Sequence, residues 1–405
     1  MENFIFHNTT KLVFGDNGEE QIPELIKQYG GTNVLLHFGG QSAEKNGLLP
    51  KIRKSLTAAK IPFTELSGVV SNPRLELVKY GVAIAKQKKC DFILAVGGGS
   101  AIDSAKAIAI AYYNENFWED QFMNGLPIEK ALPLACVLTI PAAGSESSPS
   151  TVITDELGGY KRGFGSPLIR CKFSIINPLN CKTVPDFHLA SGIVDMLGHI
   201  FERYFSLTEN TELINAMGEA VMRTIIEQGK KTMADRTDMN ALAEIVLCGT
   251  MAHNDILGIG RVQDWACHKM EHELSAKWDI THGSGLAVMY PAWLKFLLAN
   301  GNEKHFAVME RFAKNVFGID GENTDGENTE SENTDGKNAI TQMIDELEKF
   351  YKTIGMPVRL SDLDITPTDD DITQMIDKAL HGRKTLGEFY KLGKKEIAEI
   401  YNLAK

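Results

Sequence analysis

Residues 90–113, CDFILAVGGGSAIDSAKAIAIAYY, decide the fold class of this chain. An apolar run of strand length ends in three glycines, and apolar residues at helical spacing follow directly. The same order of strand, turn and helix occurs upstream, and another strand is predicted downstream. These further elements are residues 32–40, 47–60, 61–66, 75–89 and 132–141. Such alternation is typical of a parallel sheet with helices on both faces.

The remaining elements divide the chain into two domains. Residues 150–166 contain two short strand-like runs around a Glu-Leu-Gly-Gly turn and predict a β-hairpin. After Pro185 the apolar spacing is helical almost throughout, so we predict an α/β domain over residues 1–184 and an all-helical domain over residues 185–405. Residues 321–338 repeat Glu-Asn-Thr and lack apolar side chains. We expect a mobile surface loop there rather than a metal or partner site.

Composition limits the classes of function. The chain has 405 residues, which is too many for one compact core and fits two domains. Its formal net charge of -11, without a Lys/Arg stripe, argues against nucleic acid as a partner. No apolar run reaches the length of a membrane span, and residues 1–15 do not resemble a signal peptide. The six cysteines show no CxxC spacing, so we expect reduced thiols and a cytoplasmic location.

The glycine-rich turn in residues 97–99 is a candidate phosphate site. Ser100 can cap the following helix, with Asp103 three positions on as its capping-box partner. Free backbone N–H groups and the positive end of the helix dipole attract an anion, and glycines let a pyrophosphate approach the backbone. A tight turn without a ligand is about equally compatible, because the spacing matches neither GxGxxG nor a Walker motif.

A second turn of this kind follows the strand predicted over residues 32–38. It contains Gly39, Gly40 and Ser42, with Lys45 shortly after. In a dinucleotide site, an acidic residue after this strand would hold the ribose 2′-hydroxyl of NAD. None follows directly, which leaves room for a 2′-phosphate and favours NADP(H). Ordinary turn chemistry is the alternative.

An apolar helix in the second domain carries two polar residues. Residues 192–205, GIVDMLGHIFERYF, place Asp195 and His199 four positions apart on one helix face. Two interpretations are open. Either these residues are half of a metal site, or they form a hydrogen-bonded pair that locks helix packing without a metal. Glu202 shares their face one turn further on, and we expect it at the solvent-side or salt-bridged end of the helix.

Three histidines downstream favour the metal site. His268 and His272 are again four positions apart, and His282 follows in a glycine-rich turn. An uncompensated buried carboxylate is very costly, and metal coordination offsets that cost. A set of one Asp and three His suits a borderline divalent metal such as Fe²⁺ or Zn²⁺ and leaves positions open for a substrate oxygen.

Four segments together resemble the iron-dependent (group III) alcohol dehydrogenases, in the branch of NADPH-using butanol dehydrogenases and aldehyde reductases. They are GGGSAIDSAKAIA at residues 97–109, TIPAAGSESSPSTVIT at 139–154, NPLNCKTVPDFHLASGIVDMLGHIFERY at 177–204 and QDWACHKMEHELSAKWDITHGSGLAVMYPAW at 263–293. The resemblance covers nearly the whole chain. It implies a dehydroquinate synthase-like architecture, in which a Rossmann-like dinucleotide-binding domain precedes an all-helical metal-binding domain. It also implies a homodimer.

The resemblance further assigns the metal ligands and the nucleotide site. Asp195, His199, His268 and His282 would bind the metal, most simply Fe²⁺, and His272 would be a non-ligand histidine near the nicotinamide and the substrate. The nucleotide would contact Gly39, Gly40, Ser42, Gly97, Gly98, Gly99, Ser100, Asp103, Thr139, Ser148 and Lys161.

Two of these residues carry the expected catalytic roles, and two positions depart from the family pattern. Asp103 would lie near the nicotinamide and is counted with His272 as catalytic. Many members of the family have Thr where this chain has Ala143, and relatives often have Asn where it has Ser148. Both departures bear on nucleotide affinity rather than on the reaction.

The implied activity is reversible NADP(H)-linked hydride transfer between primary alcohols and aldehydes of the butanol type, with broad specificity. His272 or a ribose-hydroxyl relay would move the proton. Trp265, Leu189 and Phe187 are candidate walls of the substrate pocket or plain core. The alternatives are an NAD-linked alcohol or polyol dehydrogenase of the same family, a metal-dependent lyase of the dehydroquinate synthase type, and a non-catalytic nucleotide-binding or metal-storage protein. The lyase is less favoured because the pocket segments lack a basic cluster.

Overall fold

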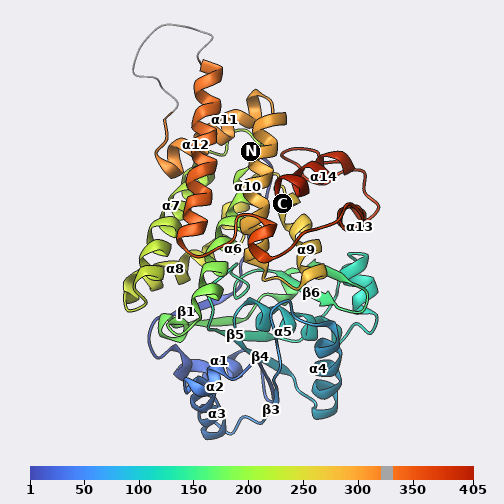
Figure 1. Cartoon of the computed structure of the whole chain (residues 1–405). Coiled ribbons are helices and arrows are strands. Elements are labelled where there is room, and N and C mark those ends of the chain that lie inside the picture. The colour runs from blue at the N-terminus through green and yellow to red at the C-terminus, as the bar shows by residue number, and fades with distance from the viewer. Residues whose placement is uncertain (321–331) are drawn as a thin grey trace. The chain divides into compact units, whose positions relative to one another are not determined.

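The computed structural model describes residues 1–320 and 332–405, which form two compact units (Figure 1). The sheet unit consists of His7–Gly192 and Arg236–Asn254. The helical unit consists of Met1–Phe6, Ile193–Asp235 and Asp255–Lys405.

The sheet unit contains a six-stranded parallel sheet in the order β1-β8-β5-β4-β2-β3. Its strands are β1 (Lys11–Phe14), β2 (Val34–Phe38), β3 (Phe63–Leu66), β4 (Phe92–Gly97), β5 (Leu134–Leu138) and β8 (Phe173–Ile176). The central strands β2, β4 and β5 are buried along their length, which explains their uninterrupted apolar sequences. The predicted α/β architecture is therefore confirmed. Strands β1 and β8 extend the sheet beyond the strands that the sequence predicts.

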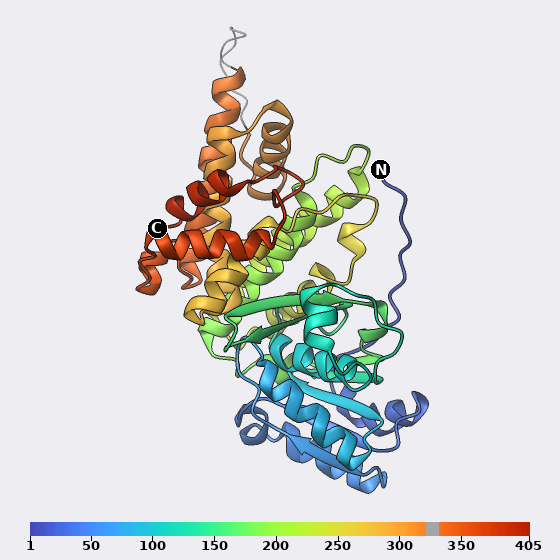
Figure 2. The same ribbon diagram turned by 90° about the vertical axis from the view of Figure 1, so that its right-hand side faces the viewer.

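Helices cover both faces of this sheet. They are α1 (Ile22–Gln28), α2 (Ser42–Lys45), α3 (Leu48–Ala58), α4 (Leu75–Lys88) and α5 (Gly99–Ala111). Apolar side chains of α1 and α3 pack on alternate residues of β2 and β4, such as Leu36 and Leu94. Helices α4 and α5 pack together, α5 contacts β4, and both lie in front of the sheet in Figure 2.

An antiparallel hairpin and a late helix complete the sheet unit. The hairpin pairs β6 (Ser150–Asp155) with β7 (Tyr160–Gly165), as the sequence predicts. The late helix is α8 (Met239–Ala252). Its Thr250 hydroxyl donates to Glu146 Oε1 at 2.5 Å, which ties α8 to the loop between β5 and β6.

The helical unit is built around α10 (His282–Asn300), which is apolar on nearly all sides and buried along most of its length. It packs on α9, α12 and α14. The other helices are α6 (Asp186–Tyr204), α7 (Glu212–Ala234), α9 (Ala266–Trp278), α11 (Glu303–Phe312), α12 (Glu332–Thr353), α13 (Asp369–Leu380) and α14 (Lys394–Leu403). Short 3₁₀ and π-helical turns cover Gly18–Gln21, Trp118–Met123, Pro167–Ile169, Pro178–Cys181, Ile256–Gly258, Ala313–Phe317 and Leu360–Leu363.

The division between the units differs from the predicted boundary after residue 184. Helix α6 begins in the sheet unit and continues past Gly192 into the helical unit, and α8 returns to the sheet unit. Gly192 lies so close to the loop after β5 that an added Cβ would meet the Pro141 carbonyl oxygen at 2.1 Å. A helix that passes between units keeps its periodicity, so the sequence pattern does not mark this boundary.

The predicted loop over residues 321–338 also differs in part. Helix α12 begins at Glu332, so residues 332–338 are helical. The buried apolar residues Ala339, Ile340 and Met343 anchor the helix, which continues back to Glu332 although this segment contains the poor helix former Gly336. Residues 321–331 of the predicted loop lie outside the described residues.

Two further expectations concern the membrane and the cysteines. Among the helices of residues 1–320 and 332–405, none combines the length and the apolar character that a membrane crossing requires. All six cysteines are free and buried in the part of the chain that the structure describes.

A buried histidine on β2 makes the sheet unit sensitive to acid. His37 is fully buried, with its Nδ1 2.9 Å from the Leu66 carbonyl oxygen and its Nε2 2.8 Å from Ser104 Oγ. Because the carbonyl only accepts, Nδ1 carries the proton and the Ser104 hydroxyl donates to Nε2. Burial lowers the pKa of His37 from 6.5 to about 4, and the bond to Leu66 only partly opposes this shift.

We expect acid to destabilise the metal-free protein through His37. The pKa is lower in the folded state than in the unfolded state, so the unfolded chain takes up the proton first as the pH falls. The contribution of His37 to the free energy of unfolding is intact above pH 6.5. It is lost towards pH 4, at about 1.4 kcal/mol per pH unit. Thermal unfolding between pH 7.5 and 5 measures the loss. The His37→Asn variant, which keeps a donor for Leu66, should show a flatter pH profile; an equally steep profile would assign the acid sensitivity elsewhere.

Candidate active site

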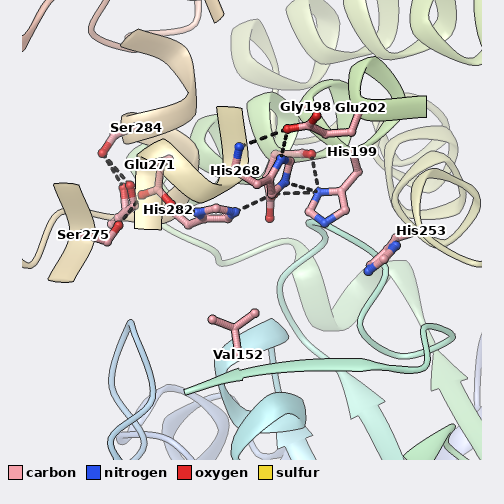
Figure 3. A network of polar contacts seen from close by, with 12 residues as sticks. Val152, Gly198, His199, Glu202, His253, His268, Glu271, Ser275, His282 and Ser284 are labelled. Atoms are coloured by element: carbon pink, nitrogen blue, oxygen red, sulfur yellow. Dashed lines mark hydrogen bonds and ion pairs between the residues drawn. The ribbon is translucent and has the colours of Figure 1, made fainter. Parts of the chain in front are cut away.

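Three helices of the helical unit bring polar side chains together (Figure 3). Asp195 lies in the middle of α6, His268 is in the first turn of α9, and His282 is the first residue of α10. One potential ligand atom from each of these three residues lies within 4.8 Å of the others. The atom His282 Nε2 is 3.7 Å from Asp195 Oδ1. Three of the four predicted metal ligands therefore converge.

The fourth predicted ligand, His199, lies directly beside this set. Its Nδ1 is 3.0 Å from Asp195 Oδ1 and 3.3 Å from His268 Nε2. The same Nδ1 is 3.0 Å from the backbone oxygen of Asp195, one helical turn earlier. The i, i+4 spacing on α6 thus places the carboxylate and the imidazole next to each other.

The charge state of the set suits a divalent cation. Asp195 is buried, and its Oδ1 makes no well-aligned hydrogen bond among the described residues, although His199 Nδ1 lies 3.0 Å away. Burial would raise the pKa of Asp195, but His199 and His282 outweigh it and hold the pKa well below its ordinary value. Burial, with His199 and His282 next to it, lowers the pKa of His268 well below the ordinary value, so its ring is neutral. An ionised, unsatisfied carboxylate oxygen beside a neutral imidazole fits a bound metal.

Glu202 has a different environment from the one expected. It is 2% exposed, so the expected solvent-side position is wrong. The other expectation, a paired carboxylate, fits the structure, with His268 as the partner. Its Oε1 accepts from His268 Nδ1 at 2.7 Å and from the His268 backbone N–H at 3.0 Å, and its Oε2 accepts from the Trp265 N–H at 2.5 Å. The first turn of α9 has free N–H groups that need acceptors, and the polar face of α6 supplies one.

Glu271 is a second buried carboxylate that sequence reasoning missed. It is fully buried on α9 and contacts both His282 Nδ1 and Ser275 Oγ (Figure 3). Together with His272 and His282, it forms a second group of potential metal ligands within 4.8 Å. The His272 and His282 ring centroids are 5.5 Å apart. The signal in the sequence was an acidic residue between two histidines, one of them next to it, on a helix with an apolar face.

Of the three predicted pocket walls, one lies at the histidines. The Trp265 ring centroid is 5.1 Å from that of His268 and 5.7 Å from that of His199. Leu189 is fully buried in the sheet unit and belongs to its core, whereas Phe187 is 43% exposed there.

The predicted nucleotide site lies in the sheet unit, where β4 runs into α5. Gly97 ends β4, Gly98 precedes the helix and Gly99 is its first residue. Ser100 therefore lies inside the first turn, and no side chain caps α5, so the predicted capping box is wrong. The Asp103 carboxylate instead accepts from Ser145 Oγ at 2.5 Å and from the Val152 N–H at 2.9 Å.

The glycines differ in what requires them. A Cβ on Gly97 would lie 2.5 Å from the Ala101 side chain, and one on Gly98 would lie 2.7 Å from Ile140. A Cβ on Gly99 would meet nothing closer than Ser145 at 4.0 Å. Packing thus explains the first two glycines, whereas open space at Gly99 is what an approaching anion requires.

The other predicted nucleotide contacts surround this turn or follow β2. Thr139, just after β5, donates its N–H to the Gly97 carbonyl at 3.0 Å. After β2, a Cβ on Gly39 would lie 3.2 Å from the Val69 carbonyl oxygen, and one on Gly40 would meet nothing within 4 Å. Ser42 begins the short helix α2.

Two predicted contacts near the hairpin are buried. Lys161 is 4% and Ser148 is 1% exposed. The Ser148 hydroxyl lies 3.1 Å from Nζ of the fully buried Lys106, a residue that sequence reasoning did not single out.

Comparison with known proteins decides the family. The family model described as "Iron-containing alcohol dehydrogenase" matches residues 9–178, and the model "Fe-containing alcohol dehydrogenase family, C-terminal" matches residues 189–404. The chain belongs to the iron-containing alcohol dehydrogenase family.

Relatives and solved structures in this family match the chain over its whole length. The probable NADH-dependent butanol dehydrogenase 1 of Bacillus subtilis is 40% identical over 99% of both chains. The NADPH-dependent aldehyde reductase of Escherichia coli is 31% identical over 100% of both. The crystal structure of NADH-dependent butanol dehydrogenase A from Thermotoga maritima has a TM-score of 0.90 and 37% identity, and the match covers 100% of this chain and 99% of that one.

These matches confirm the resemblance and the fold class that it implies. An iron-containing alcohol dehydrogenase is a metal-dependent oxidoreductase of alcohols and aldehydes that uses a nicotinamide nucleotide. The named relatives include both NADH-dependent and NADPH-dependent enzymes.

Proposed function

We propose that the protein transfers hydride reversibly between primary alcohols and aldehydes of the butanol type, with broad specificity and with NADP(H) as the nucleotide. In this proposal Asp195, His199, His268 and His282 hold one divalent metal, most simply Fe²⁺. The single observation that carries the proposal is the buried, ionised Asp195. Its Oδ1 lies 3.0 Å from His199 Nδ1 and 3.7 Å from His282 Nε2, yet makes no well-aligned hydrogen bond among the described residues. Such an oxygen needs a cation.

The four residues suit a Lewis acid. A divalent metal bound there would polarise a substrate oxygen, which helps hydride move to or from the nicotinamide. The competing set of Glu271, His272 and His282 is less suitable, because the Glu271 carboxylate already contacts Ser275 and His282. His272 is then not a metal ligand in this proposal.

The remaining residues bind, orient and exchange protons. His272 is partly exposed, and its ring lies 5.5 Å from that of His282, so we assign it the proton exchange with the substrate oxygen. Asp103 holds Ser145 and the backbone of Val152. We therefore assign Asp103 a positioning role in the nucleotide site rather than a catalytic one. The open side of Gly99, together with Ser100 and Thr139, would receive the pyrophosphate.

The preference for NADP(H) rests on the turn after β2. The first acidic residue after that turn in the sequence is Glu44, and Arg53 Nη1 donates to its two carboxylate oxygens at 2.9 and 2.6 Å. A carboxylate engaged in this way is a poor partner for a ribose hydroxyl. The open side of Gly40, with Gly39 and Ser42 next to it in the sequence, leaves space for a 2′-phosphate. An NAD-linked enzyme of the same family is the alternative.

We also propose a cytoplasmic homodimer. The six unpaired, buried thiols suit a reducing compartment. Strand β1 lies at one edge of the sheet, and Leu12 and Phe14 on it are 41% and 46% exposed. An apolar, unpaired edge strand favours pairing with a second copy.

The test is removal and return of the metal. We expect the chelated, dialysed protein to lose nearly all reduction of butanal by NADPH, and anaerobic Fe²⁺ to restore it, because the metal site is the Lewis acid. Nicotinamide absorbance measures both rates. Full activity without metal would refute the mechanism. NADPH and NADH are compared at matched concentrations in the same assay, and a clear preference for NADH would overturn the reading of the β2 turn.

A further inference from the structure

We infer that Glu202 and Glu271 are positioning residues for the metal site. Each buried carboxylate accepts the Nδ1 proton of one histidine ligand and so turns the Nε2 of that ring towards the metal. The inference rests on the proposed function, because it assigns roles around the site proposed there. It concerns two residues that the ligand set itself does not include.

The contact between Glu202 and His268 has the more complete geometry. Glu202 Oε1 lies 2.7 Å from His268 Nδ1 on one side of the ring. On the other side, Nε2 lies 3.3 Å from His199 Nδ1 and faces the ligand set. An ionised carboxylate has no proton to donate and can only accept a hydrogen bond. This contact therefore places the proton of His268 on Nδ1 and leaves the lone pair on Nε2.

Glu202 is itself held from two directions. The backbone N–H groups of Trp265 and His268 donate to its two oxygens at 2.5 and 3.0 Å. Tyr290, whose hydroxyl donates to the Gly198 carbonyl at 2.8 Å, lies 3.4 Å from His268 Nδ1. The carboxylate therefore fixes the start of α9 and the ring on it in one position.

The contact between Glu271 and His282 repeats this arrangement of carboxylate and imidazole on a different pair of helices. Glu271, on α9, contacts His282 Nδ1, while Nε2 of the same ring lies 3.7 Å from Asp195 Oδ1. Ser275, one turn after Glu271, donates its hydroxyl to the carboxylate. The two ring nitrogens of His282 thus face two different carboxylates, one on each side.

Burial argues for a role beyond packing. Glu202 is 2% exposed and Glu271 is 0% exposed. Buried carboxylates are costly unless a strong donor faces them, and an imidazole bound to a divalent cation is a stronger N–H donor than a free one. The carboxylates in turn make the histidines better ligands. Each carboxylate–histidine pair is consequently expected to raise the affinity for the metal.

Glu271 offers the cleaner experiment, because Glu202 also holds the start of α9. The variants are Glu271→Leu, which removes the acceptor, Glu271→Gln, which keeps an acceptor without its charge, and the control Ser275→Ala. Ser275 touches the same carboxylate without touching a histidine ligand. The probe is Co²⁺, added to metal-free protein in competition with a chelator. Its visible spectrum reports ligand geometry, and the thermal midpoint of each metal-free protein reports folding.

We expect Glu271→Leu to bind Co²⁺ about 10- to 100-fold more weakly than the wild type and to show an altered spectrum. Glu271→Gln should lie between, and Ser275→Ala should bind Co²⁺ like the wild type. Should Glu271→Leu not fold, Glu271→Gln supplies the same comparison at nearly equal side-chain volume.

Unchanged Co²⁺ affinity in a folded Glu271 variant would overturn this inference alone, as would an equal loss in Ser275→Ala. A wild type that binds no Co²⁺ would overturn the proposed metal site and the inference with it. The two failures are therefore distinguishable.

Discussion

The His268→Ala variant is expected to lose stoichiometric metal and roughly 10³-fold or more in the rate of butanal reduction while keeping its fold. His268 contributes a neutral ring nitrogen to the proposed site, next to the buried carboxylate of Asp195. Removing the ring leaves an incomplete ligand set. Metal analysis of anaerobically purified protein and the rate with NADPH measure the two losses.

The matched control is His272→Ala, on the same helix and one turn later. The structure groups His282 in two ways, with Asp195 and His268 or with Glu271 and His272. If the first group holds the metal, His272→Ala keeps its metal and loses only part of its activity, with a changed pH dependence. Retained metal in His268→Ala, together with loss of metal in His272→Ala, would assign the site to the second group.

Much of the fold was predictable because local patterns coincide with the final packing. Strands β2, β4 and β5 are apolar runs of strand length, and the turn after β4 is rich in glycine. Those features need no information about distant contacts. The unit boundary inside α6 was not predictable, because it depends on contacts with distant segments, such as that of Gly192 with Pro141 inside the sheet unit, and leaves no mark in the helical spacing.

The candidate site was predictable to the extent that helical spacing reveals a shared face. The spacing places Asp195 and His199 side by side, and they are 3.0 Å apart. It also places Glu202 on that face, but only the packing of α9 shows that this end of the face is buried. Glu271 and Lys106 were missed for the same reason, since their partners come from other segments of the chain. Without knowledge of those partners, an acidic or basic residue in a helix is interpreted as an ordinary surface residue.

Lys106 is the residue in the sheet unit whose loss should matter most. Its fully buried ammonium lies within hydrogen-bond distance of five oxygens in the loop after β5 and at the start of β6. These are the carbonyl and hydroxyl oxygens of Ser145 at 2.7 and 3.1 Å, those of Ser148 at 3.0 and 3.1 Å, and the Ser150 carbonyl at 2.8 Å. Burial lowers the pKa of Lys106, and the neighbouring Asp103 opposes that shift. One side chain thus holds the loop that carries the proposed nucleotide contact Ser148.

We expect Lys106→Met to destabilise the sheet unit by about 3–5 kcal/mol, because it leaves buried oxygens without a donor. The freed loop should also weaken NADPH binding by about tenfold or more. A loss of about 1.4 kcal/mol in binding free energy, the cost of ordering the loop again, corresponds to a factor of ten in affinity. Thermal unfolding and titration of nicotinamide fluorescence measure the two effects. Lys79→Met is the matched control, because Lys79 lies on α4 with its side chain 50% exposed and pairs with Glu76. A Lys106→Met protein as stable as that control would mean that the loop holds its shape without the ammonium, and the five oxygens would then need water as their donor.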